Sequence, residues 1–170
     1  MSIIILTRSP IAYRVCAYNQ ISEEWDQLGD DIPSPFTSSE AAAISRDGTR
    51  IAVVRDSISS KRPGSVHIYD WKVKNDNIDG GDTANVYSWE PVGNPINRIS
   101  IYPDNINDDD EGSGFGRSLA MSADGNLLAI GSIDPDCDGR PDFCSTGTIE
   151  LLAYDNKSLL NIGQRALLHE

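Results

Sequence analysis

The chain has 170 residues, with 26 acidic and 14 basic side chains and a formal net charge of −12. This balance excludes nucleic acid as a partner, because phosphate contacts need clustered Lys and Arg, and it disfavours an anionic membrane surface. Apolar residues make up 39% of the chain, as in ordinary globular domains, and no apolar run approaches the roughly 18 residues that direct membrane insertion requires.

The first segment, residues 1–32, is interpreted as a partial structural unit. The apolar run Ile3-Ile-Ile-Leu6 is shorter than the roughly 7–15 residues of a signal-peptide core, so no signal peptide is visible in this chain. We expect this run to be the second strand of a unit whose first strand is missing. The strand Arg14-Val-Cys-Ala-Tyr18 and the signature Trp25-Asp-Gln-Leu-Gly29 follow it.

Residues 36–96 are expected to form a complete unit. The stretch Ile44-Ser-Arg-Asp-Gly-Thr-Arg-Ile-Ala-Val53 predicts two strands joined by a turn at Asp47-Gly48, because glycine accepts a positive φ without penalty. In Gly64-Ser-Val-His-Ile-Tyr69, apolar and polar residues alternate as in a half-buried strand. Trp89-Glu-Pro-Val-Gly93 then repeats the signature that begins at Trp25.

Residues 114–163 repeat the same order of signatures. Met121-Ser-Ala-Asp-Gly-Asn-Leu-Leu-Ala-Ile130 matches the hairpin at residues 44–53, and Gly147-Thr-Ile-Glu-Leu-Leu152 matches the strand at residues 64–69. The last signature, Leu159-Leu-Asn-Ile-Gly163, is a weak copy. The signatures of each complete unit therefore predict four antiparallel strands that pair in chain order.

The predicted fold is all-β, a single partial propeller over residues 1–170. Units of four antiparallel strands arranged around an axis make a β-propeller. The chain holds about two and a half units, whereas a closed ring takes four to eight. An open arc exposes unpaired strand edges, so we expect either a fragment of a longer propeller or an incomplete ring that pairs with further blades or other copies.

The third unit resembles an FG-GAP repeat, the blade of the integrin α-subunit propeller. The resemblance rests on Phe115-Gly116, on the Ser-x-Asp-Gly turn that ends at Gly125, and on the strands that follow. The second unit departs from the pattern, with Ser38-Ser39 where Phe-Gly would recur. The resemblance implies an extracellular or cell-surface adhesion scaffold that binds a protein or glycan ligand, with calcium loops in its blades.

The loop at residues 134–142 is the candidate calcium site. Ca²⁺ takes six to eight oxygen ligands, and alternating aspartates around Gly139 can point inward together. The alternative is a solvated loop closed by a Cys137–Cys144 disulfide. The loop follows the apolar strand, whereas the family places its calcium loop before it. The expected ligands are Asp134, Asp136, Asp138, the backbone carbonyl of Arg140, and Asp142.

The sequence contains no catalytic constellation, and we expect no enzymatic activity from this chain. His67 and His169 have no partner at the spacing of a metal site or a triad. The residues at 108–111 are acidic without alternating spacing and are interpreted as solvated. Two alternatives stay open: a segment of a larger secreted hydrolase or lyase with catalytic residues elsewhere, and a truncated gene without independent function. Strand tryptophans are expected to pack between blades: Trp25, Trp71 and Trp89.

Overall fold

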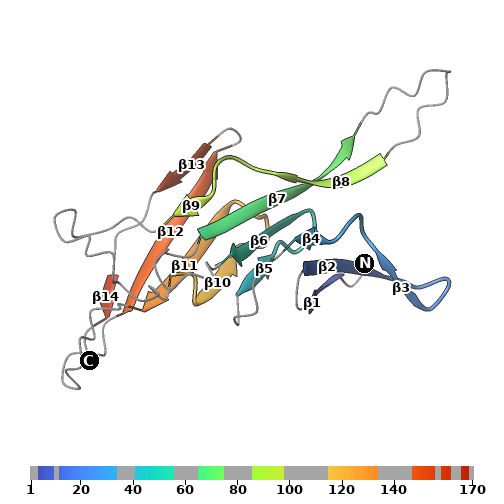
Figure 1. Cartoon of the computed structure of the whole chain (residues 1–170), viewed down its shortest axis with the longest axis horizontal. Coiled ribbons are helices and arrows are strands. Elements are labelled where there is room, and N and C mark those ends of the chain that lie inside the picture. The colour runs from blue at the N-terminus through green and yellow to red at the C-terminus, as the bar shows by residue number, and fades with distance from the viewer. Residues whose placement is uncertain are drawn as a thin grey trace.

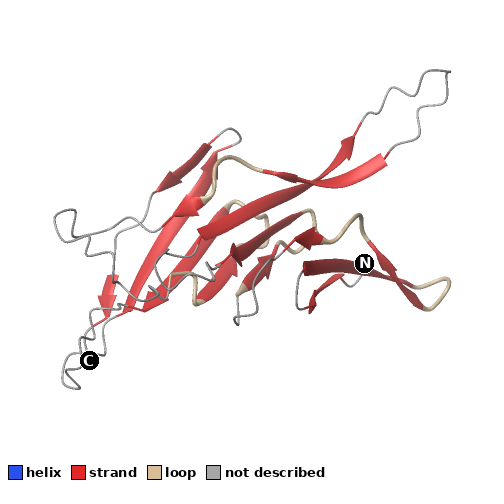
Figure 2. Ribbon diagram, in the orientation of Figure 1, coloured by secondary structure: helices blue, strands red, loops and turns tan. Residues whose placement is uncertain are grey.

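The computed structural model describes residues 4–9, 12–33, 41–55, 65–74, 86–97, 115–133, 147–155, 158–161 and 166–168. Within these ranges the chain consists of strands and turns, with no helix (Figure 2). The strands form three antiparallel sheets, which we name A, B and C in chain order. The prediction of an all-β fold is confirmed for this part of the chain.

Sheet A is built from the N-terminal strands. It contains β1 (Ile4–Ser9), β2 (Ala12–Asn19), β3 (Glu24–Gln27) and the short β4 (Ile32–Pro33). The order is β1-β2-β3, and β4 pairs with β2 farther along the same side as β3. Gly29 lies between β3 and β4 with φ of 66°, so a left-handed glycine interrupts the outer strand.

Sheet B has the same plan with one more strand. Its members are β5 (Ala42–Ile44), β6 (Arg50–Arg55), β7 (Ser65–Lys74), β8 (Val86–Pro91) and β9 (Ile96–Asn97). The order is β5-β6-β7-β8, and β9 pairs with β7. The strands therefore pair in chain order inside one repeat, as the sequence predicts.

Sheet C copies sheet B. Its members are β10 (Ser118–Met121), β11 (Leu127–Ile133), β12 (Gly147–Asp155), β13 (Ser158–Asn161) and β14 (Ala166–Leu168). The order is β10-β11-β12-β13, with β14 paired to β12. Each repeat thus completes its own sheet, and the pairing between strands does not cross from one copy to the other.

The registers of sheets B and C agree residue by residue. In sheet B, Ala52 lies opposite Ile68. In sheet C, Ala129 lies opposite Leu151. Since residues 44–53 match residues 121–130 in sequence, Ala52 and Ala129 hold equivalent positions, as do their partners. This equivalence lets each side chain of one sheet be compared with its counterpart in the next.

The three sheets stack face to face, with sheet B in the middle (Figure 1). Along β6 the side chains alternate between faces. Ile51 and Val53 are buried against sheet A, whereas Ala52 and Val54 are buried against sheet C. Both faces of sheet B are therefore internal, which explains why four successive positions of β6 are apolar and buried.

Two hydrophobic clusters hold the stack together. The cluster between sheets A and B comprises Tyr13, Val15, Ile32, Ile51, Val53 and Tyr69. The cluster between sheets B and C comprises Ala52, Val54, Val66, Ile68, Val92, Phe115, Leu128, Ile130 and Leu152. Phe115 of the Phe-Gly signature enters this second cluster, and Gly116 beside it has φ of 77° and contacts Val54. The Phe-Gly signature therefore serves packing between sheets.

Candidate functional site

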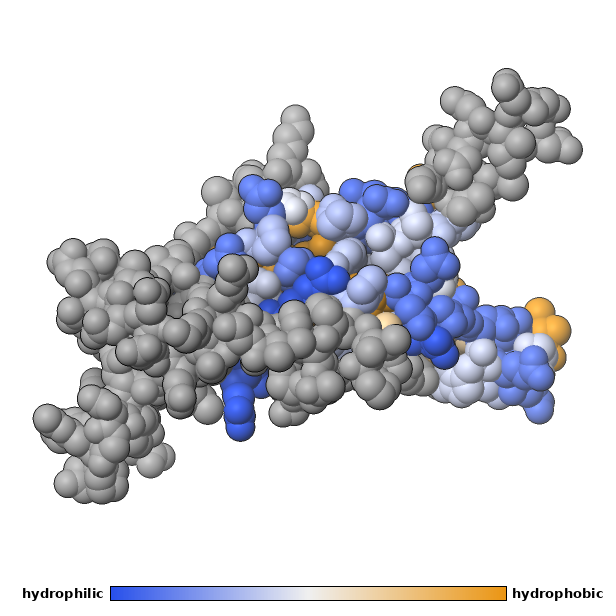
Figure 3. All heavy atoms as spheres, viewed as in Figure 1, coloured by the Kyte–Doolittle hydropathy of each residue, from blue (hydrophilic) through white to orange (hydrophobic). Residues whose placement is uncertain are grey.

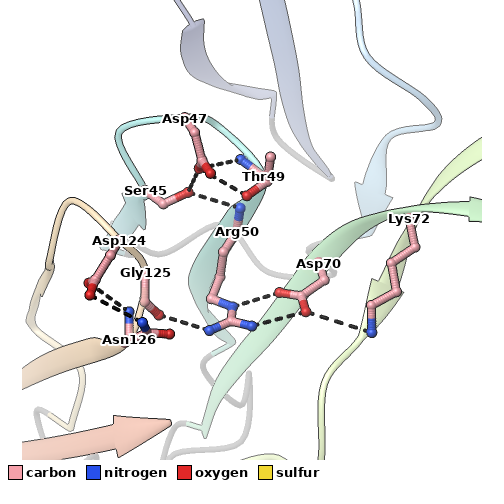
Figure 4. Close-up of polar contacts among 9 residues, drawn as sticks. All are labelled: Ser45, Asp47, Thr49, Arg50, Asp70, Lys72, Asp124, Gly125 and Asn126. Carbon is pink, nitrogen blue, oxygen red and sulfur yellow. Dashed lines mark hydrogen bonds and ion pairs between the residues drawn. The ribbon is translucent and has the colours of Figure 1, made fainter. Parts of the chain in front are cut away.

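Two Ser-x-Asp-Gly turns lie side by side where sheets B and C meet (Figure 4). One turn joins β5 to β6 and the other joins β10 to β11. The backbone N–H of Arg46 donates to the carbonyl of Ala123 at 2.9 Å, so a hydrogen bond holds the two turns together. We call this pair of turns, with Arg50 and Asp70 beside them, the turn cluster.

Backbone hydrogen bonds within the β5–β6 turn hold it closed. The N–H of Ser45 donates to the carbonyl of Arg50 at 2.9 Å, and the N–H of Gly48 donates to the carbonyl of Ser45 at 3.0 Å. Gly48 has φ of 72°, which an L side chain rarely adopts. The positive φ expected for the Asp-Gly pair is therefore present in the glycine.

Asp47 braces this turn from within. Its Oδ1 accepts hydrogen bonds from Ser45 Oγ at 2.7 Å, from the N–H of Thr49 at 3.0 Å and from Thr49 Oγ1 at 2.9 Å. The Ser45 hydroxyl, followed by the Thr49 N–H, lowers the pKa of Asp47 below its ordinary 3.8, because these donors favour the ionised form. One carboxylate oxygen thus serves three donors of its own turn.

The β10–β11 turn repeats the same arrangement. Asp124 Oδ1 accepts from Ser122 Oγ at 2.5 Å and from the N–H of Asn126 at 3.1 Å, and the Ser122 bond contributes most to lowering the pKa of Asp124. Asp124 therefore fastens its own hairpin, as Asp47 does in sheet B.

Arg50 ties sheet B to sheet C. Its guanidinium donates to both carboxylate oxygens of Asp70, at 2.6 and 3.0 Å, and to the carbonyl of Gly125 at 3.0 Å. It also lies 4.0 Å from the centre of the Tyr154 ring. Asp70 raises the pKa of Arg50 further, and both side chains of the pair are 14% exposed. The guanidinium is therefore occupied by the fold and does not present a free anion site.

The exposed rim of the turn cluster is polar. Arg46, Thr49, Asp124 and Asn126 are all exposed, and Lys72 lies 3.6 Å from Asp70 (Figure 4). On the side of the molecule seen in Figure 3, the described atoms are mainly hydrophilic, with a few apolar patches between them. Donors and acceptors of both charges at this rim suit hydrogen bonding to a polar ligand.

The predicted calcium ligands lie outside the described residues. All five positions, from Asp134 to Asp142, fall between β11 and β12 in a part of the chain that is not described, as do Cys137 and Cys144. The acidic run at 108–111, between β9 and β10, also lies outside the described residues. Across the described strands and turns, no group of three or more His, Cys, Asp or Glu side chains is arranged to hold a metal ion.

A Ser–His contact on β7 is a feature that sequence spacing did not predict. Ser65 Oγ lies 2.9 Å from His67 Nε2. Burial lowers the pKa of His67, and the positive charge of Arg55 lowers it further. The hydrogen bonds among the described residues bring no carboxylate to this imidazole, so the third, orienting group of a catalytic triad is missing there.

The tryptophans of sheet B pack between sheets as expected. Trp89 Nε1 donates to the carbonyl of Leu28 in sheet A at 2.9 Å, and Trp71 lies 5.0 Å from Trp89 between ring centres. Trp25 differs, because it pairs with Tyr18 at 5.3 Å and is 45% exposed. Its place is on the face of sheet A that points away from sheet B.

The described strands and turns include no helix long and apolar enough to cross a membrane. No protein-family model, curated protein or solved structure matches this chain.

Proposed function

We propose that this chain is a non-enzymatic binding segment made of β-propeller blades of the FG-GAP type. In this proposal the blades fan around an axis, and the polar turns and loops at one edge recognise a protein or glycan ligand outside the cell. A calcium ion bound by the loop at residues 134–142 makes that loop rigid. The proposed ligands are those expected from the sequence.

The observation that carries the proposal is the repeated way in which the sheets stack. Sheet A packs on one face of sheet B and sheet C packs on the other, and equivalent positions fill equivalent places. Val15 of sheet A and Ile68 of sheet B, whose carbonyls accept from the equivalent N–H groups of Leu28 and Val92, are both buried towards the next sheet. Successive meander sheets packed in one direction are what a propeller requires of adjacent blades.

The turn cluster supports binding rather than catalysis. Its carboxylates accept hydrogen bonds within their own turns, and Arg50 is held by Asp70, so these groups are fixed in place. A rigid polar rim loses little conformational entropy when a ligand binds. Function on loops that a rigid scaffold positions is a common arrangement.

Calcium binding is tested by titrating Ca²⁺ into the protein in a calorimeter. The expected result is saturable heat at micromolar to millimolar Ca²⁺ that disappears in the double variant Asp136→Asn, Asp138→Asn. The matched control is Asp124→Asn, which also removes a negative charge from an Asp-Gly turn but leaves the proposed ion site intact. The absence of heat at millimolar Ca²⁺, or equal loss in the control, contradicts the calcium proposal.

Ligand binding is tested on a glycan array and by cross-linking to surface proteins, each with Ca²⁺ and with a chelator. Binding that depends on Ca²⁺ and is lost in the Asp136, Asp138 variant is the expected result. Equal binding by the wild type and the variant would show that the loop at residues 134–142 is not required for ligand recognition.

A further inference from the structure

The outer face of sheet C is apolar and partly exposed, and no described strand packs on it. This face points away from sheet B and carries Leu127 on β11 and Ile149 and Leu151 on β12, which are 40%, 41% and 36% exposed. Two small residues of β11 complete this face: Ala129 lies opposite Leu151, and Gly131 lies opposite Ile149. We call this surface the C face. Large exposed aliphatic side chains on one sheet face indicate an interaction surface.

The equivalent face of sheet B shows what such a surface does in this protein. By register, Val66 corresponds to Ile149 and Ile68 to Leu151. In sheet B these side chains are 0% and 5% exposed because sheet C covers them. The same positions are therefore buried by a following sheet in one repeat and open in the next.

The C face is also more apolar than its counterpart. Where sheet B places the Arg50–Asp70 ion pair, sheet C has Leu127 opposite Ala153. The change removes two charges from the surface and adds an exposed leucine. Contact with water therefore costs more at the C face than it would at the corresponding face of sheet B.

The opposite end of the stack presents the complementary kind of face. In the contact between sheets A and B, sheet B contributes Tyr69 and Trp89. Trp71 lies opposite Trp89 in sheet B just as Tyr18 lies opposite Trp25 in sheet A, so Tyr18 corresponds to Trp71 and Trp25 to Trp89. Tyr18 and Trp25 form an aromatic pair on the outer side of sheet A. We call this surface the A face. Each internal contact joins one face of each kind, and among the described strands one face of each kind has no sheet packed on it.

We propose that the C face of one copy packs on the A face of a second copy, head to tail. A second copy fits both faces because the chain already contains two contacts of this kind, between sheets A and B and between sheets B and C. The new contact would extend this stack in the same direction. A heterologous contact closes into a ring only if its rotation permits. Two copies supply six sheets, within the four to eight of closed propellers; this ring size, unlike the contact, rests on the proposed propeller arrangement.

The net charge of each copy determines how association depends on salt concentration. Each copy carries −12, so two copies repel one another at low ionic strength, and salt screens this repulsion. Burial of aliphatic and aromatic side chains is much less sensitive to salt. We therefore expect association to strengthen from about 20 to 300 mM salt, the reverse of a contact made by ion pairs.

The test is sedimentation velocity of the full chain and of single variants over a range of concentrations. Leu151→Lys on the C face and Trp25→Lys on the A face should each weaken association at least about thirtyfold, because each places a charge in an apolar contact. The control is Val73→Lys, which replaces a 41% exposed strand residue outside both faces and should leave association unchanged. Far-UV circular dichroism checks that each variant is folded.

Mixing the two variants distinguishes the head-to-tail arrangement from its alternatives. The Trp25→Lys copy keeps an intact C face and the Leu151→Lys copy keeps an intact A face, so an equimolar mixture should form a 1:1 dimer that neither forms alone. Loss of association in Leu151→Lys alone would mean that C faces pair with each other and would overturn the proposal. A wild type that stays monomeric at 100 µM would also overturn it. Open chains in electron micrographs would uphold the contact and overturn only the six-sheet ring.

Discussion

Replacing Gly29 with alanine is expected to destabilise the protein more than the same change at Gly93. Both glycines end a signature that consists of Trp, two variable residues, an apolar residue and Gly, and both have a backbone φ angle of 66°. Alanine in this left-handed conformation costs about 1–2 kcal/mol at either site. The backbone term therefore cancels when the two variants are compared.

The two sites differ in what an added methyl group meets. A Cβ at Gly29 would lie 2.6 Å from Cζ3 and 3.0 Å from Cη2 of Trp71, whereas a Cβ at Gly93 meets no atom within 4 Å. Trp71 is held between Tyr87 and Trp89, so its ring has little freedom to move aside. Overpacking of this kind costs about 1–3 kcal/mol. The free energy of unfolding should fall by that additional amount in Gly29→Ala.

The assay is urea denaturation followed by tryptophan fluorescence and circular dichroism. In a chain of this length each kcal/mol also lowers Tm by about 2–4 °C, so thermal melts check the result independently. In a Trp71→Leu background the penalty of Gly29→Ala should shrink to that of Gly93→Ala. Equal losses at the two glycines in the wild-type background would refute the face-to-face packing of sheet A on sheet B.

Two further predictions concern charge. Arg50→Met should lower the free energy of unfolding by about 2–4 kcal/mol, because it leaves the largely buried Asp70 with only Lys72, 3.6 Å away, as a partner. Arg14→Met, which breaks an exposed pair, should cost clearly less, and equal costs in urea melts would contradict the inter-sheet role of Arg50. Stability should decline as pH falls below about 6.5, the ordinary pKa of histidine, because the unfolded chain protonates His67 before the folded chain does; His67→Gln should flatten this slope, and an unchanged slope would assign it to other groups. A second decline should follow below pH 3.8, as Asp47 and Asp124 are protonated through their lowered pKa values, and Asp47→Asn should reduce it.

The repeats in the sequence were enough to predict the sheets. Each hairpin signature contains a glycine that the turn requires, and alternation assigns the strands of the GSVHIY type to a half-buried surface. Local patterns of this kind need no knowledge of distant residues. The same reasoning did not predict that β4, β9 and β14 continue the outer strand of each sheet, because each pairs with a strand that lies well back along the chain.

The turn cluster could not be predicted, because it is formed by contacts that the spacing of residues along the sequence does not indicate. Arg50 reads as an exposed residue at the start of a strand, yet its partners are 20 and 75 residues away. Asp47 and Asp124 were recognised as turn residues, but their hydrogen bonds to the preceding serines were not. The Ser65–His67 contact lies within one strand at a spacing of two, which a search for triad spacing passes over.

The left-handed glycine that follows each tryptophan signature also limits the length of the outermost strand. Without it, residues 86–97 would form one long exposed rim; with it, the rim is cut into β8 and β9, and Pro33 further blunts the corresponding rim of sheet A. Short, bent rims are poor templates for adding strands from other molecules. Strand addition at this edge is therefore disfavoured, and the outer faces of sheets A and C are the route by which we propose that copies meet.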